Sequence, residues 1–157
     1  MSEDTPAIRE IAASGVSFTV VRTERASSAE ESAAFQGIEV GRLIRTIVVR
    51  RGAGDYVFVL VPGGRQIEWP LLRAHLGVSR LSLPDQEEAR GATGYERGTI
   101  TPFASSTTWP VVADASLIGP APVAIGAGAH GVNVHLDPAE LVRLLDADVA
   151  DVTRPAS

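Results

Sequence analysis

The chain has 157 residues, no cysteine, three histidines and a formal net charge of −5. Disulfides, thiolate metal sites and cysteine nucleophiles are therefore excluded. All fourteen basic residues are arginine, which also excludes Schiff-base chemistry on a lysine.

Two short helices are predicted near the N-terminus, with a strand between them. The first helix opens at Thr5, has proline at its first position and stops at Gly15. The run VSFTVV, residues 16–21, predicts the strand. Ser28 begins a capping box that leads the second helix through Phe35.

A β-hairpin is predicted next, from the β-branched and aromatic runs at 43–50 and 55–61 and the turn sequence RGAGD between them. A helix over 69–77 follows, closed by its terminal glycine. The remaining predicted elements are a short strand and a helix within 81–90, strands at 109–114, 122–128 and 131–136, and a final helix over 138–147.

These elements predict an α+β fold in a single domain, residues 1–157. Strands follow one another through hairpins as often as through helices, which favours a mixed, largely antiparallel central sheet. The runs TIVV and VFVLV are apolar on both faces, so helices should cover that sheet.

The composition also limits which metals, cofactors and partners the chain is expected to bind. The histidines lack the spacing of a metal site, and we expect no metal and no cofactor. The N-terminus has no apolar signal core and no window approaches a membrane span, so we expect a soluble, cytoplasmic protein without a membrane partner. An acidic chain binds nucleic acid poorly without a local patch, and DNA is not expected as a partner.

Four arginines lie close together in the sequence: Arg42, Arg45, Arg50 and Arg51. They are the densest candidates for a local RNA-binding patch. For Arg50 and Arg51 the alternative is a solvated strand edge that charge keeps soluble.

The segment VAIGAGAHGVNVHL contains Gly126, Gly128 and Gly131 in the spacing G-x-G-x-x-G. A dinucleotide site needs a helix directly after these glycines, but here an alternating strand pattern follows. We therefore interpret the glycines as a turn between two strands, whose backbone comes close to another part of the molecule.

The loop over residues 93–106, TGYERGTITPFASS, has neither helical nor strand periodicity. Long irregular loops inside compact domains are often functional. The stretch from Gly98 to Pro102 could expose backbone N–H groups to an anion or a developing oxyanion. The alternative is a packed loop without a ligand.

Several segments occur in a fixed order: AEESAAFQG, LIRTIVVR, DYVFVLVP, LRAHLGVSRLSL, ATGYERGTITPF, VVADASL and GAGAHGVNVHLDPAELVRLLDADVADV. The most specific are the G-Y-x-x-G-x-x-x-P-F loop and the glycine-rich segment before the last helix. Together they resemble the YbaK-type aminoacyl-tRNA deacylase family, the free-standing relatives of the prolyl-tRNA synthetase editing domain. The resemblance runs from about residue 15 to residue 152.

The resemblance implies a pocket between the sheet and the two loops that holds a small aminoacyl group on the 3′ end of a tRNA. It implies that Gly98 offers its backbone N–H to the ester, and that the substrate's own ribose hydroxyl or side chain replaces a protein base. The implied catalytic residues are Arg45 and Gly98, and the implied substrate-binding residues are Thr46, Tyr95, Thr101, Pro102, Phe103, Gly126, Gly128, His130 and Asn133.

Three positions depart from the family pattern. Arg45 stands where most members carry lysine, Asn133 where some carry aspartate, and Ala104 where glycine is usual. Arginine keeps the positive charge but cannot serve as an acid or base. We expect Arg45 to point into the pocket beside Gly98 and Gly128.

The roles of several side chains stay open from the sequence. Tyr95 and Phe103 could stack on adenine, line the pocket or pack in the core. His130 could orient a water molecule or be a bystander on the turn. His75 and His135 are predicted to be structural.

The leading functional hypothesis is a hydrolase that acts in trans on a mischarged aminoacyl-tRNA, with a small amino acid such as Cys or Ala on tRNA-Pro. Its partners would be the tRNA acceptor end and an aminoacyl-tRNA synthetase. A non-catalytic binding module for aminoacyl-tRNA ends or amino-acid-like ligands is the alternative, and a small-ligand protein unrelated to tRNA is a third.

Overall fold

The computed structural model describes residues 5–156. The helices are α1 Pro6–Ala13, α2 Ala29–Gln36, α3 Trp69–Leu76, α4 Gln86–Thr93 and α5 Pro138–Leu145, with short 3-10 turns at Val40–Arg42 and Ala115–Leu117. The strands are β1 Thr19–Arg22, β2 Ile44–Gly52, β3 Asp55–Pro62, β4 Arg65–Ile67, β5 Val111–Asp114, β6 Val123–Gly126, β7 Val132–Leu136, β8 Asp148–Ala150 and β9 Thr153–Pro155.

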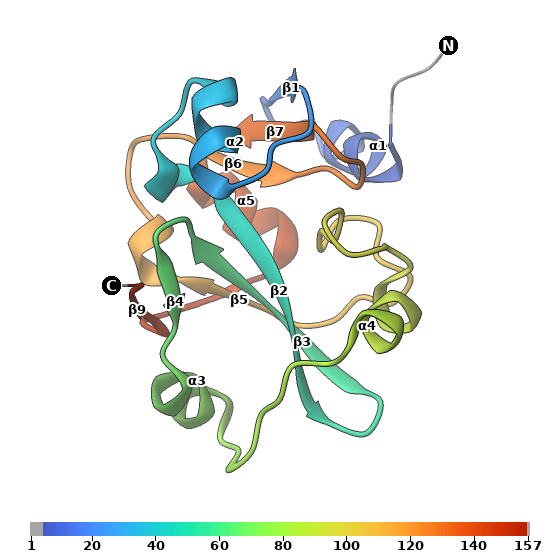
Figure 1. The fold of residues 1–157 in the computed structure, drawn as a ribbon, viewed down its shortest axis with the longest axis vertical. Helices are drawn as coiled ribbons and strands as arrows, with labels where there is room; N and C mark the ends of the chain where they lie inside the picture. Colours follow the sequence, from blue (N-terminus) through green and yellow to red (C-terminus); the bar gives the residue numbers. More distant parts are fainter. Residues whose placement is uncertain (1–4, 157) are drawn as a thin grey trace.

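The strands form a mixed, largely antiparallel set, which confirms the predicted α+β class. One sheet has the order β2-β3-β5-β8, a second β1-β7-β6, and a third pairs β4 with β9. A bridge between Leu43 and Ala124 brings the start of β2 beside β6. Figure 1 shows the β1-β7-β6 sheet above the long β2–β3 hairpin, with α3 at the opposite end.

The hairpin of β2 and β3 is antiparallel, with Arg45 opposite Val61 and Val49 opposite Val57. The predicted hairpin of residues 43–50 and 55–61 is therefore confirmed. Strand β5 then pairs in parallel with β3, and β8 pairs in parallel with β5.

The side chain of the buried Asp114, at the end of β5, accepts a hydrogen bond from the Val152 N–H. Its hydrogen bonds hold the pKa of Asp114 below the ordinary value, although burial acts to raise it.

Local capping explains where the helices begin. Thr5 accepts a hydrogen bond from Ile8 N–H at the start of α1, and Ser28 accepts one from Glu31 N–H at the start of α2. Each α-helix of the described residues has eight residues. None of these helices has the length and apolar character needed to cross a membrane.

Three short strands, β4, β8 and β9, were not predicted. The strand expected before α4 is reduced to a single bridge between Ser82 and Arg50, and β1 begins at Thr19 rather than residue 16. These elements depend on distant partners instead of a long local pattern, because β9 pairs with β4 and β8 with β5.

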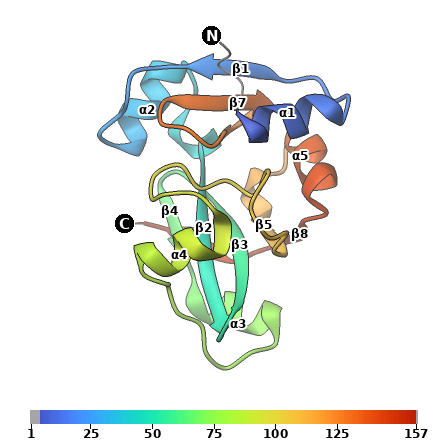
Figure 2. The same ribbon diagram turned by 90° about the vertical axis from the view of Figure 1, so that its right-hand side faces the viewer.

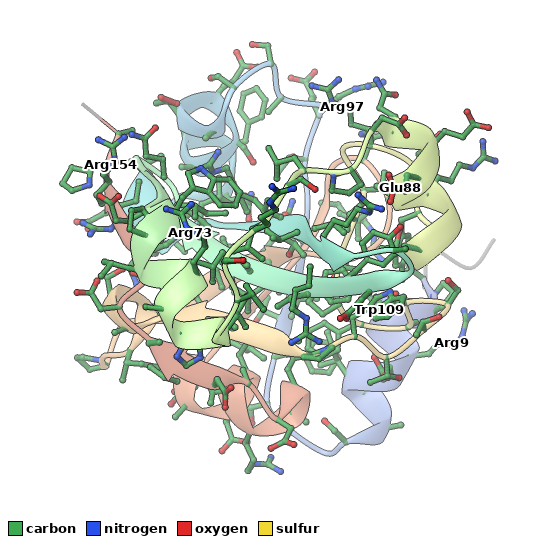
Figure 3. The ribbon with its side chains drawn as sticks, turned by 90° about the horizontal axis from the view of Figure 1, so that it is seen from below. Arg9, Arg73, Glu88, Arg97, Trp109 and Arg154 are labelled. Atoms are coloured by element: carbon green, nitrogen blue, oxygen red, sulfur yellow. The ribbon has the colours of Figure 1, made fainter. Side chains whose placement is uncertain are left out.

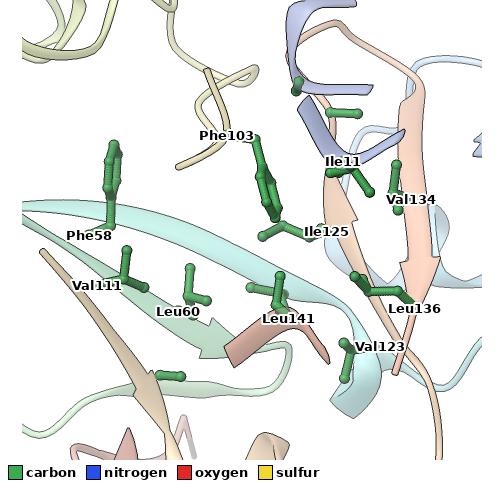
Figure 4. Close-up of a cluster of buried hydrophobic side chains, with 14 of the residues drawn as sticks. Ile11, Phe58, Leu60, Phe103, Val111, Val123, Ile125, Val134, Leu136 and Leu141 are labelled. Atoms are coloured by element: carbon green, nitrogen blue, oxygen red, sulfur yellow. The ribbon is translucent and has the colours of Figure 1, made fainter. Parts of the chain in front are cut away.

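The core lies on both faces of β2 and β3. Ile44 and Val48 of β2 pack into one cluster with Phe58 and Leu60 of β3, whereas Val49 packs into a second cluster on the other face. Phe103 points into the first cluster toward Ile125 (Figure 4). Side chains on the two faces of β2 therefore contact different parts of the molecule.

Candidate active site

The loop after α4 and the turn between β6 and β7 meet beside the start of β2. In Figure 2 the yellow loop lies directly beneath the orange β6–β7 hairpin. Between them is a cleft with two lobes, here called the hairpin lobe, about 280 Å³, and the strand lobe, about 350 Å³. Both lobes are lined by Ser32, Gly98, Ile100, Gly126 and Asn133.

The tip of the loop is a tight turn that exposes the backbone of Gly98. The Thr99 N–H donates to the Glu96 carbonyl at 3.1 Å, and Gly98 in the third position has a φ of 90°. This positive φ is typical of the third residue of a type II turn, where glycine is preferred. Within residues 5–156 the structure gives the Gly98 N–H no acceptor, so it can donate to a ligand in the cleft.

His130 lies directly against Gly98. A Cβ atom added at Gly98 would come within 2.9 Å of His130 Cε1. The ring also contacts Glu96, whose Oε1 is 3.5 Å from His130 Nε2. The imidazole therefore connects the two loops and lines the hairpin lobe, where the sequence predicted it.

The glycine-rich turn connects β6 to β7, as predicted, so a strand and not a helix follows it directly. Gly128 has a φ of 90°, and a Cβ atom there would lie 3.0 Å from Tyr95 Cε1. The part of the molecule that approaches this turn is therefore the aromatic ring of the other loop. Gly126 lines both lobes and Gly128 lines the hairpin lobe.

Tyr95 and Phe103 hold the base of the loop. The Tyr95 hydroxyl donates to the Phe103 carbonyl at 2.6 Å. Burial, together with the Glu10 charge, raises the pKa of Tyr95, so its phenol stays protonated at neutral pH. Phe103 is 2% exposed and belongs to the core. Its burial favours core packing for Phe103 over the predicted role in binding substrate.

Thr101 and Pro102 also lie outside the cleft. Thr101 is fully buried, and its hydroxyl has no hydrogen-bond partner among the described residues. Pro102 lines a separate cavity with Glu10 and Phe103. Their positions do not favour the predicted contacts with the substrate, because the chain turns into the core directly after Ile100.

Arg45 is at the rim of the strand lobe, but its side chain is not directed as expected. Successive side chains of a strand point to opposite faces, so Arg45 lies on the face opposite Thr46. Its guanidinium donates to the carbonyl of Arg65 on β4. Gly98 lines the same lobe and Gly128 does not. The expected inward orientation of Arg45 is wrong, since alternation along β2 gives Thr46 the inward position.

At Thr46 the backbone edge of β2 faces the cleft. This orientation was not predicted from the sequence. Gly63 N–H donates to Leu43 O, and the backbone of Arg50 instead exchanges hydrogen bonds with Ser82. Antiparallel pairing alternates, so even-numbered residues of β2 turn their N–H and C=O away from β3. Thr46 therefore presents both groups to the strand lobe.

The predicted arginine patch does not form one surface. Arg42 donates to carbonyl groups around residues 116–122, Arg50 pairs with Glu88, and Arg51 pairs with Asp55. The arginines that line the cleft are instead Arg25 in the hairpin lobe and Arg97 in the strand lobe, beside the rim position of Arg45. Arg97 lies near α4 (Figure 3).

The other two histidines are away from the cleft, as predicted. His75 Nε2 is 3.6 Å from an Asp148 carboxylate oxygen, and His135 Nε2 is 2.9 Å from the Gln36 side-chain oxygen. Burial lowers the pKa of His135. Over residues 5–156, no group of three or more His, Cys, Asp or Glu side chains is placed to hold a metal ion.

The sequence pattern of the aminoacyl-tRNA editing domain matches residues 23–144, which include both loops and β2. The chain belongs to the aminoacyl-tRNA editing domain family. A candidate Cys-tRNA(Pro)/Cys-tRNA(Cys) deacylase of Enterococcus faecalis, EbsC, is 25% identical over 126 residues, which cover 80% of this chain and 77% of EbsC. The proline–tRNA ligase of Syntrophotalea carbinolica is 32% identical over 120 residues, 74% of this chain but only 21% of the ligase.

Solved structures of similar proteins have the same fold as this chain. The hypothetical protein APE2540 superposes with a TM-score of 0.87 at 25% identity, covering 96% of this editing domain and 100% of that chain. A candidate trans-editing enzyme for prolyl-tRNA synthetase superposes with a TM-score of 0.82 at 27% identity, covering 96% and 98%. The editing domain thus resembles both free-standing proteins and a segment of much longer ligases.

Proposed function

We propose that residues 1–157 form a single editing domain that hydrolyses the ester of a mischarged aminoacyl-tRNA. The proposed substrate is a small amino acid such as cysteine or alanine on tRNA-Pro, and the proposed partners are the tRNA acceptor end and an aminoacyl-tRNA synthetase. Family membership supports the reaction class. The observation that carries the proposal is the unpaired Gly98 N–H in a cleft formed by both loops.

The chemistry needs a water molecule, an oxyanion donor and a leaving ribose oxygen. Water adds to the ester carbonyl carbon and the carbonyl electron pair moves to oxygen, which then accepts a hydrogen bond from Gly98 N–H. Collapse of this intermediate breaks the bond to the ribose oxygen, which takes up the proton that the water lost. A donor of this kind typically contributes about 2.7–4 kcal/mol to transition-state stabilisation.

No strong protein base is required for this reaction. Tyr95 stays protonated because its pKa is raised, and Arg45 cannot exchange a proton at neutral pH. We expect the terminal ribose hydroxyl of the substrate to relay the proton. The imidazole of His130, in contact with Gly98 and Glu96, positions the donor loop and the attacking water.

The size of the cleft favours a small aminoacyl group. Ligand pockets usually measure about 300–1,000 Å³, and the hairpin lobe, with about 280 Å³, lies just below this range. Asn133 and the Thr46 backbone edge offer polar contacts to the aminoacyl amine and the ribose. Arg45, at the rim, adds positive charge near the entering phosphates.

A deacylation panel tests this function. Purified protein is incubated with alanyl-, cysteinyl- and prolyl-tRNA-Pro, and release of each amino acid is followed against a sample without protein. We expect faster release of alanine or cysteine and no faster release of proline. If a non-hydrolysable aminoacyl-tRNA mimic binds but no small amino acid is released, the domain is a binding module. If the protein neither binds nor hydrolyses, it shares only the fold.

A further inference from the structure

A third cavity continues the cleft away from the ester. This outer groove has a volume of about 620 Å³ and is lined by Val48, Leu83, Pro84, Glu87, Arg97 and Ile100, among others. Arg97 and Ile100 also line the strand lobe. Val48 follows Thr46 by two residues, so both lie on the same face of β2. A chain that leaves the strand lobe along this face therefore enters the outer groove.

The floor of the outer groove is apolar. Val48, Pro84 and Ile100 contribute to it, and Leu83 is 60% exposed beside them. An exposed leucine next to a proline offers a flat apolar surface, and flipped or unpaired nucleobases commonly pack between such apolar side chains. The surface therefore suits the face of a base.

The carboxylates of the outer groove favour a ligand with a hydrogen-bond donor. The Asp85 side chain caps α4 by accepting from Glu88 N–H, and Glu88 is paired with Arg50. Glu87 has no ion pair or hydrogen bond to another described side chain and lines the groove. A carboxylate accepts hydrogen bonds and repels phosphate, and the N4 amino group of cytosine is a donor that carboxylates recognise.

Arg97 stands between the two cavities. No other described residue pairs with its guanidinium. It is thus a free positive charge at the point where a phosphodiester would pass from the strand lobe into the outer groove. Arginine binds phosphate with two parallel hydrogen bonds, so this position suits the linkage between two nucleotides.

Every tRNA ends in the nucleotides CCA, so a cytidine precedes the aminoacylated adenosine. We propose that the outer groove binds this penultimate cytidine, with its base on Leu83 and Pro84, its N4 amino group donating to Glu87 and its phosphate on Arg97. This inference depends on the proposed function for its substrate, but it concerns a part of the molecule that takes no part in the ester chemistry.

The test exchanges one base. Minihelix RNAs with tRNA-Pro acceptor stems carry either C or U at the penultimate position, because uracil replaces the N4 donor with an acceptor. The ratio of kcat/KM for the two alanylated RNAs is measured for the wild type and Glu87→Gln. Glu140→Gln, on the distant helix α5, is the matched control. Equilibrium binding of the uncharged minihelices gives the corresponding ratio of Kd values for C and U.

We expect the wild type and Glu140→Gln to favour C over U by about tenfold. Glu87→Gln should bring the ratio close to one, because the new amide can donate to the uracil carbonyl. Equal handling of C and U by the wild type would overturn the inference. Absence of hydrolysis with a preserved C preference in binding would reject the proposed function and leave the inference standing.

Discussion

The tip and the base of the loop over residues 93–106 differ in what they contribute, although they lie within ten residues of each other. The tip, from Glu96 to Ile100, lines the cleft with Gly98, Thr99 and Ile100, and the Gly98 N–H has no acceptor among the described residues. The base, formed by Tyr95 and by residues 101–103, is tied together by the Tyr95–Phe103 hydrogen bond and enters the core.

This difference shows that one loop combines a structural role and a chemical role. The hydrogen bond from the Tyr95 hydroxyl to the Phe103 carbonyl fixes the loop, and the fixed loop in turn holds the N–H of Gly98 at the cleft. Three substitutions separate the two roles: those in the base should leave the rate of the folded protein unchanged, and the one at the tip should lower it.

The largest expected effect comes from the base. Phe103→Ala should lower the free energy of unfolding by about 3–5 kcal/mol, because it leaves a cavity in the core. This corresponds to a fall in Tm of roughly 6–20 °C. Thermal unfolding measures it, and deacylation by the folded fraction at low temperature should stay close to that of the wild type. Loss of catalysis in fully folded Phe103→Ala would place this ring at the substrate.

At the tip, Gly98→Ala should lower deacylation by about 10²-fold. A side chain there is strained at positive φ and displaces His130 from the loop, so the donor no longer meets the oxyanion. The strain should cost about 1–2 kcal/mol of stability. Gly94→Ala is the matched control, since Gly94 also has a positive φ in this loop but does not line the cleft. Equal losses of activity in both variants would show that strain alone is responsible.

The smallest effect is expected at Thr101. Thr101→Val keeps the shape of the side chain and removes a buried hydroxyl that has no partner among the described residues. Such a change is typically neutral or stabilising, so Tm should stay the same or rise slightly and kcat/KM should be unchanged. A tenfold loss of kcat/KM would instead mean that the hydroxyl reaches the substrate, as the motif first indicated.

Much of the fold could be predicted from the sequence, because its longest elements have strong local patterns. The apolar runs of β2 and β3, with a glycine turn between them, specify their own pairing. Thr5 and Ser28 cap helices as predicted. The three-residue strands β4, β8 and β9 could not be predicted, since their order comes from partners such as Asp114 that are distant in the chain.

The candidate site was predicted in part. Gly98, Gly126, Gly128, His130, Asn133 and Thr46 lie around the cleft. The position of Arg45 in the motif could not reveal that strand alternation directs its side chain to the Arg65 carbonyl. Arg97 was missed for the opposite reason: it is an ordinary loop arginine in the sequence, and only the fold brings it between the strand lobe and the outer groove.

The central claim is that the backbone of the loop tip, and no side chain of the loop base, contacts the scissile group. The most direct test is a crystal structure of the protein with adenosine that carries alanine through a 3′-amide bond, which cannot be hydrolysed as the ester is. We predict that the alanyl carbonyl oxygen lies about 2.7–3.2 Å from the Gly98 nitrogen, with the alanyl group in the hairpin lobe. A ligand that contacts Thr101 or Phe103, or that binds outside the cleft, would contradict this account.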